Sequence, residues 1–320
     1  MGPLEKELAI ARERYRNWGR WGPDDVRGTL NYIDDGKRAA AATLVHSGRS
    51  ISLAQEFNAQ GPQNGFRGRI NPLHTMTESG LDAAAGVQGF AHGFGGADDL
   101  VVLPLQSGTQ WDGLGHIFDH KQAWNGRPCD RVVTSAGDQV TGIERLAADF
   151  VSRGVLLDVG RAVGTDGELP DGFAILEEHL HATIDAQGPT AAVGRGDIVL
   201  VRTGQLARCR RRGFWGEYAN GPAPGFSFTT LDWLYRTQIA AAATDTWGFE
   251  VRPYEFEPPC FSPLHQIAIP NMGLLLGEMF DLEALAGDCA ADGRYEFLLV
   301  AAPLPVTGGV GAPLNPIALK

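Results

Sequence analysis

The stretch GDIVLVRTG, residues 196–204, is a short apolar run of valine, isoleucine and leucine enclosed by glycines. A run of this kind, bounded by turn residues, is typical of a β-strand. Helical patterns of apolar residues flank it at 175–188 and 231–237. Further apolar, strand-like runs occur at 100–105, 154–160, 239–246 and 295–304. Strands that alternate with helices predict an α/β fold, with a central β-sheet and helices packed outside it.

The rest of the chain predicts further helices, a loop-rich region and the number of domains. Apolar residues at positions 4, 8, 11 and 15 follow helical spacing, so residues 1–33 are expected to form an N-terminal helical arm. Helices are also expected at 34–48 and 142–154, and a loop-rich region at 60–96. Because no repeat, linker or sharp change of composition divides the chain, residues 1–320 are expected to form a single domain.

The composition excludes several kinds of partner. The 27 basic and 38 acidic residues leave a net charge of -11 without long blocks of one sign, which argues against nucleic acid. No run of about 18 apolar residues occurs, so no membrane partner is expected. The stretch MGPLEKELAIARERYRNW is charged from its fifth residue, and a cytoplasmic location is therefore expected. The cysteines lack CxxC spacing and are expected to be free thiols.

The stretch QSGTQWDGLGHIFDH, residues 106–120, gathers polar groups after the predicted strand at 100–105. Alternate residues of an extended segment share one face, so Gln106, Gln110, Asp112 and His116 are expected to converge there. Two amides, a carboxylate and an imidazole at the end of a strand are suited to binding a substrate and moving a proton. The alternative is that Asp112 caps a turn and His116 is a structural histidine of the core.

Other polar and aromatic residues extend this candidate site. His265 and Glu278 stand on either side of an apolar run, and polar groups buried there need partners. His74, Trp111 and Trp247 are further candidates for substrate binding, with burial in the core as the alternative for the tryptophans.

The segment SGTQWDGLGH resembles the signature H-x-G-T-H-x-D-x-P-x-H of the cyclase family that includes bacterial kynurenine formamidase and isatin hydrolase. Its glycine, threonine, aspartate and last histidine match, whereas Gln106, Gln110 and Leu114 replace His, His and Pro. The segments NWGRWGPDDVRGTLNYI, GDIVLVRTG, SPLHQ, LGEMFDLEAL and PLPVTGGVGAPLNPIA are similar to the longer branch of the family. The resemblance implies a single α/β domain with a mixed, barrel-like sheet, and a homo-oligomer in which the N-terminal arm packs against a neighbouring subunit.

The resemblance also implies roles for individual residues. Asp112, His265 and Glu278 fall on positions that ligate divalent metal in the family's formamidases, and His116 falls on the position of the general acid/base. Gln106 and Gln110 stand where the family has ligating histidines. An amide oxygen is a much weaker ligand for zinc than an imidazole, so a two-zinc site is not expected.

Three possibilities remain for the metal. Carboxylate, amide and imidazole groups could hold a single Mn²⁺ or Mg²⁺ ion, with Gln110 as a further ligand. A zinc ion with few protein ligands is the second possibility. In the third there is no metal, and Asp112, Glu278 and His116 act as general acid and base while the two amides bind the substrate carbonyl.

The expected function is that of a hydrolase acting on an amide, lactam or lactone bond of a small, cyclic or aromatic substrate, with His116 as general acid/base. One alternative is a metal-independent lyase, dehydratase or cyclase acting on a similar substrate. Another is a protein that binds a small molecule without turning it over.

Overall fold

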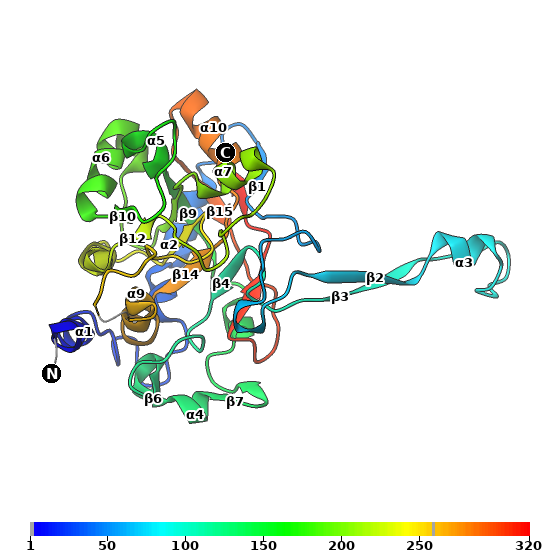
Figure 1. Ribbon diagram of the computed structural model, residues 1–320, viewed down its shortest axis with the longest axis horizontal. Helices are drawn as coiled ribbons and strands as arrows, with labels where there is room; N and C mark the ends of the chain where they lie inside the picture. Colours follow the sequence, from blue (N-terminus) through cyan, green and yellow to red (C-terminus); the bar gives the residue numbers. More distant parts are fainter. Residues whose placement is uncertain (1–2, 258–259) are drawn as a thin grey trace.

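The computed structural model describes residues 3–257 and 260–320. Its centre is a curled sheet of nine strands, which confirms the predicted mixed α/β architecture (Figure 1). In sheet order the strands are β1 (Ser50–Ser52), β17 (Ile317–Leu319), β15 (Glu296–Val300), β9 (Val151–Leu157), β11 (Ile198–Val201), β13 (Ala241–Thr244), β14 (Leu275–Glu278), β4 (Gln110–Asp112) and β16 (Gly311–Pro313). Strands β9, β11, β13 and β14 are parallel, and the strands outside them pair antiparallel.

Helices and short ribbons surround this sheet. The α-helices are α1 (Pro3–Arg14), α2 (Asp35–Ala42), α3 (Gly80–Ala84), α4 (Cys129–Val132), α5 (Val159–Val163), α6 (Glu177–Gln187), α7 (Gln205–Arg212), α8 (Leu231–Arg236), α9 (Pro263–Ile267) and α10 (Glu283–Asp292). The two-stranded ribbons are β2 (Leu73–Glu78) with β3 (Asp98–Val102), β5 (Gln122–Ala123) with β6 (Arg127–Pro128), β7 (Val133–Thr134) with β8 (Gly137–Asp138), and β10 (Ala174–Ile175) with β12 (Gly225–Phe226). A π-helical turn, η7 (Ala268–Met272), follows α9.

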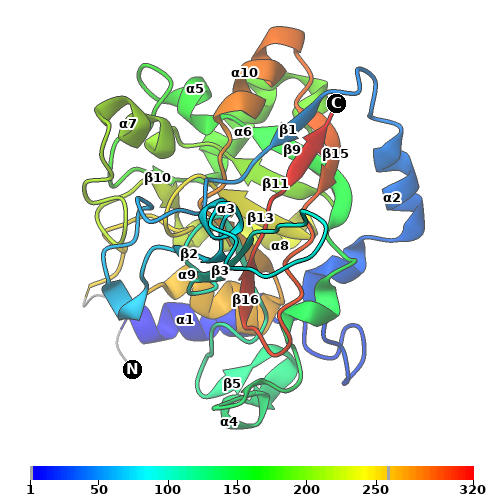
Figure 2. The same cartoon turned by 90° about the vertical axis from the view of Figure 1, so that its right-hand side faces the viewer.

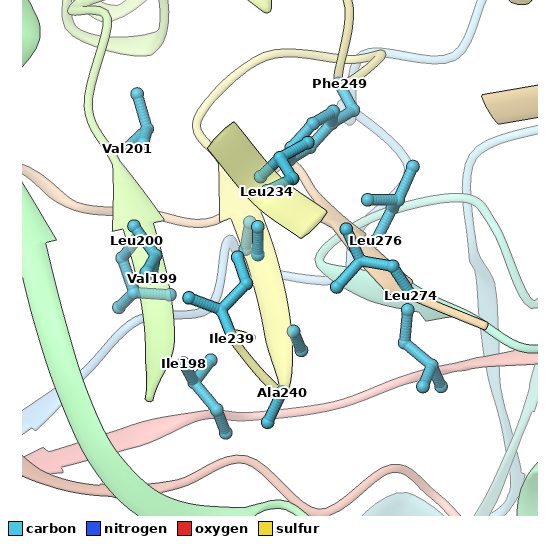
Figure 3. Close-up of a cluster of buried hydrophobic side chains, with 14 of the residues drawn as sticks. Ile198, Val199, Leu200, Val201, Leu234, Ile239, Ala240, Phe249, Leu274 and Leu276 are labelled. Carbon is cyan, nitrogen blue, oxygen red and sulfur yellow. The ribbon is translucent and has the colours of Figure 1, made fainter. Parts of the chain in front are cut away.

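The core lies on both sides of the parallel strands. Every residue of β11 and β13 is buried, as expected for parallel strands that are covered on both faces. Figure 3 shows Ile198 and Leu200 of β11 near Ile239, with Leu276 of β14 on the other side of β13. The runs predicted at 154–160, 196–204, 239–246 and 295–304 correspond to β9, β11, β13 and β15.

Two predictions about the secondary structure are wrong. The segment 142–154 is not a helix: it contains a short 3₁₀ turn at Ile143–Leu146, and β9 begins at Val151. Pairing of β9 with β11 and β15 overrides the helical pattern of this segment. The run at 100–105 lies partly in β3, which belongs to a two-stranded ribbon and not to the central sheet.

The N-terminal segment is part of the domain body. On α1, Leu8 and Ala11 are buried, and both belong to the main core cluster. The guanidinium of Arg12 forms an ion pair with Asp119, which lies in the body. In this structure the helix therefore packs on its own chain, and its contact with a neighbouring subunit stays a prediction.

A different segment projects from the body. Residues 73–102 contain β2, α3 and β3, and they extend well beyond the rest of the molecule (Figure 1). This projecting segment is named the arm. Figure 2 views the molecule from the side of this arm. All residues of β2 and β3 are exposed.

The structure also bears on the cysteines and on membrane insertion. Cys129, Cys209, Cys260 and Cys289 are free thiols, as predicted. Among the described residues, none of the helices combines the length and the apolar character needed to span a bilayer.

Candidate active site

Strand β4 and the carboxyl end of β14 bring distant parts of the sequence together. β4 runs antiparallel to β14, with Gln110 opposite Glu278 and Asp112 opposite Leu276. Because side chains alternate along a strand, Gln110 and Asp112 lie on one face of β4 and Trp111 lies on the other. Glu278, the cross-strand neighbour of Gln110, is the last residue of β14. Ligands commonly bind at the carboxyl ends of parallel strands.

Asp112, His265 and Glu278 form a buried cluster in which one ligand atom from each lies within 4.8 Å of the others. Nε2 of His265, on α9, is 3.3 Å from Oε1 of Glu278 and 3.9 Å from Oδ2 of Asp112. On the other side of the ring, Oε1 of Glu250 is 2.6 Å from Nδ1 and accepts the backbone N–H of His265. A carboxylate at one ring nitrogen directs the other nitrogen toward a ligand, as is usual for metal-binding histidines.

The charge of His265 depends on this cluster. Burial lowers the pKa of His265, but hydrogen bonds to Glu250 and Glu278 outweigh burial and raise the pKa to about 10. Without a metal, the protonated ring therefore lies among three carboxylates, those of Asp112, Glu250 and Glu278. An imidazole must be neutral to ligate a metal, so a divalent cation would replace this proton.

His116 lies beside the cluster. Its Nε2 is 3.7 Å from Oδ1 of Asp112, and its side chain is 14% exposed. Burial lowers the pKa of His116, and burial raises the pKa of Asp112. A neutral imidazole with one accessible side can take up and return a proton, which is the requirement for a general acid/base.

The orientation of the Gln110 amide decides whether this residue can be a metal ligand. Its Nε2 donates hydrogen bonds to Oδ1 of Asp112 at 3.2 Å and to Oε2 of Glu278 at 3.0 Å. Its Oε1 is buried and has no hydrogen-bond partner among the described residues. An amide that presents N–H groups to the carboxylates is a donor to them and not a fellow ligand. The site therefore fits one divalent cation held by Asp112, His265 and Glu278, with water in the open positions.

The cluster lies at the bottom of a narrow pocket. Its wall includes Trp247, and the guanidinium carbons of Arg69 and Arg252 lie 5.1 and 5.0 Å from the ring centroid of this tryptophan. An adjoining hollow of about 490 Å³ shares Phe66, Arg252, Tyr254 and Phe261 with the pocket. A hollow of this size is in the range of small-molecule sites.

Four residues predicted to bind substrate do not line this pocket, and the first of them is Gln110, which is fully buried. Trp111 is fully buried on the opposite face of β4, where it stacks on Phe150 and donates its indole N–H to the carbonyl of Ala301. His74 lies on the exposed arm, where its Nε2 is 2.7 Å from Asp99. Gln106 precedes β4, and its Nε2 is buried without a partner among the described residues.

Sequence reasoning missed Glu250, Arg252 and Arg69. Glu250 and Arg252 follow Trp247 in a loop of irregular structure, so no periodic pattern marked them. The available signal was the concentration of charged and aromatic residues between 245 and 257, a segment from which only Trp247 was predicted to belong to the site. Asp245 is buried and accepts hydrogen bonds from the backbone of Thr203 and Gly204, which is a structural role.

Comparison with known proteins identifies the family of the chain. Residues 42–251 match the family described as "Putative cyclase". The crystal structure of a novel cyclase is 37% identical, with a TM-score of 0.85, over 97% of this chain and 99% of that chain. No curated protein matches.

More distant structures share the fold. Isatin hydrolase A from Ralstonia solanacearum is 18% identical, with a TM-score of 0.61, over 88% of this chain and 95% of that chain. A potential metal-dependent hydrolase with cyclase activity is 15% identical, with a TM-score of 0.52, over 84% of this chain and 98% of that chain. Taken together with the family match and the 37% identical structure, these findings show that the chain belongs to the cyclase family.

Proposed function

We propose that this protein hydrolyses an amide, lactam or lactone bond of a small, cyclic or aromatic substrate. The main support is the convergence of Asp112, His265 and Glu278, whose ligand atoms lie within 4.8 Å of one another, beside the neutral His116. Isatin is a lactam, so the similarity to isatin hydrolases makes it a reasonable first test substrate.

The residues of the site can divide the work of hydrolysis. Asp112, His265 and Glu278 would hold one Mn²⁺, Mg²⁺ or Zn²⁺ ion, which supplies Lewis-acid polarisation of the substrate carbonyl when bound. His116 takes a proton from the attacking water and returns it to the leaving nitrogen or oxygen. The carboxylate of Asp112, 3.7 Å from Nε2, stabilises the imidazolium that forms between these steps. Gln110 bridges the carboxylates of Asp112 and Glu278 through its N–H groups.

The test combines elemental analysis of the purified protein with isatin hydrolysis by His116→Asn. Loss of the general acid/base should lower kcat by about 10²–10⁴-fold, with little change in KM. His181→Asn is the matched control, because the side chain of His181 is 56% exposed on α6; this variant should keep full activity. An H116N enzyme as active as H181N would rule out the assigned role.

Products formed in ¹⁸O-labelled water separate hydrolysis from the alternatives. Hydrolysis adds one labelled oxygen to the product, whereas elimination or cyclisation by a metal-independent lyase, dehydratase or cyclase adds none. A protein that only binds its ligand turns over no lactam, amide or lactone, and its affinity persists in His116→Ala. In a metal-free enzyme, Asp112 and Glu278 would hold the attacking water themselves, and chelators would leave the activity unchanged.

A further inference from the structure

Arg252 is a buried cation that the protein holds firmly. It is only 4% exposed. Its Nε donates to the carbonyl of Gly221 at 2.8 Å, and Nη2 donates to the carbonyl of Tyr218 at 3.4 Å. The guanidinium lies against Trp247, which packs on one of its sides. These contacts fix the direction in which the remaining nitrogen, Nη1, points.

Among residues 3–257 and 260–320, no carboxylate forms an ion pair with this cation, and Nη1 of Arg252 donates no hydrogen bond. Glu278 and Glu250 act on the guanidinium only from a distance, without direct contact. Arg202 shows the usual arrangement at similar burial, because it pairs with Asp158 at 2.9 Å and with Glu283 at 2.7 Å. A buried charge without a partner is costly, so the position of Arg252 indicates an anion that a ligand brings.

Gly248 leaves space next to Nη1. A Cβ atom at Gly248 would lie 2.9 Å from Nη1 of Arg252 and 3.9 Å from Oε1 of Glu278. The backbone of Gly248 does not have a positive φ, so its conformation does not require glycine. The missing side chain therefore opens a gap between the guanidinium and the cluster of Asp112, His265 and Glu278.

Arg252 also lines the adjoining hollow, together with Phe66, Tyr254 and Phe261. A flat ring in this hollow would direct a substituent toward Nη1 and Gly248. We propose that Arg252, beside Gly248, binds the carboxylate of a small aromatic carboxylic acid. This inference rests on the proposed function, since hydrolysis of an amide, lactam or lactone releases a carboxylate next to the cluster.

Benzoate and its neutral counterpart benzamide test the inference by calorimetric titration of the full-length protein. The wild-type protein should bind benzoate at least ten-fold more tightly than benzamide, because only benzoate carries the charge. Arg252→Met should abolish this difference. Gly248→Ala keeps the arginine but fills the gap, and it should weaken benzoate binding at least ten-fold even if Arg252→Met fails to fold. Gly287→Ala is its matched control, because a Cβ there meets no atom within 4 Å.

Equal binding of benzoate and benzamide to the wild-type protein would overturn the inference, and so would unchanged benzoate binding in G248A. Failure of the proposed hydrolysis gives a different result. In that case no substrate turns over, yet the preference for benzoate remains, and it also remains in His116→Asn.

Discussion

Replacing Gln110 by methionine should destabilise the metal-free protein, because this amide connects two buried carboxylates. Its Nε2 donates one hydrogen bond of 3.2 Å to Asp112 and another of 3.0 Å to Glu278. A hydrogen bond to a charged group contributes about 1.5–3 kcal/mol, so losing both costs about 3–6 kcal/mol. The substitution also removes the unpartnered Oε1, which returns about 1–3 kcal/mol. The middle of these ranges leaves a net loss of about 2–3 kcal/mol in the free energy of unfolding.

Urea unfolding in the presence of a chelator, followed by tryptophan fluorescence, measures this loss. Gln106→Met is the matched control, because Nε2 of Gln106 is buried without a partner among the described residues. Its removal should cost nothing or stabilise the protein. Added Mn²⁺ or Zn²⁺ should reduce the deficit of Q110M, because the cation then balances the carboxylates. The reasoning is refuted if Q110M and Q106M change the stability by the same amount.

Three further predictions concern the metal, the core and the N-terminal helix. Dialysis against a chelator should lower Tm, and saturation with a suitable divalent cation at about 100 times its Kd should restore about 2.7 kcal/mol in the wild type but not in His265→Ala; no response of the wild type to any cation would contradict the metal site. Trp111→Ala should cost about 3–5 kcal/mol in urea unfolding, whereas a rise in KM without loss of stability would assign Trp111 to the substrate after all. Asp119→Asn should cost about 1.5–3 kcal/mol at neutral pH by breaking the ion pair with Arg12. Burial raises the pKa of Asp119, but hydrogen bonds from Arg12, Asn271 and Gln266 outweigh it and lower the pKa. Its contribution is therefore present above the ordinary value of 3.8 and lost as the pH falls through the lower folded value. The difference between wild type and D119N should disappear in acid, and a difference that grows there would contradict this assignment.

The sequence predicted four neighbouring strands in the middle of the sheet better than the three strands that follow them at one side. Strands β9, β11, β13 and β15 consist largely of apolar residues, and such runs can be recognised locally. Strands β4, β14 and β16 have three or four residues each and contain glycine, proline or polar residues. Their strand conformation depends on pairing with partners far away in the sequence, and local patterns do not contain that information.

The candidate site divides in the same way. Asp112, His116, His265 and Glu278 were identified because a family signature and polar residues beside apolar runs mark them, and the structure brings all four together. Their catalytic and ligand roles remain predictions. Arg252 could not be identified in this way. Its proposed role depends on a loop that folds back onto the sheet and on the absence of an ion-pair partner among the described residues, and a local sequence pattern contains neither.

The position of β4 has a consequence for how the protein matures. This strand lies between β14 and β16, which come from the last sixth of the chain, although β4 itself is synthesised in the first half. During synthesis on the ribosome, β4 with Asp112 therefore cannot pair with β14 and β16 until almost the whole chain has emerged. Contacts between segments so distant in the sequence form slowly. In refolding, catalytic competence should therefore return after β9, β11 and β13 have acquired their structure, and an exposed β4 would be the part that most needs chaperone protection during that delay.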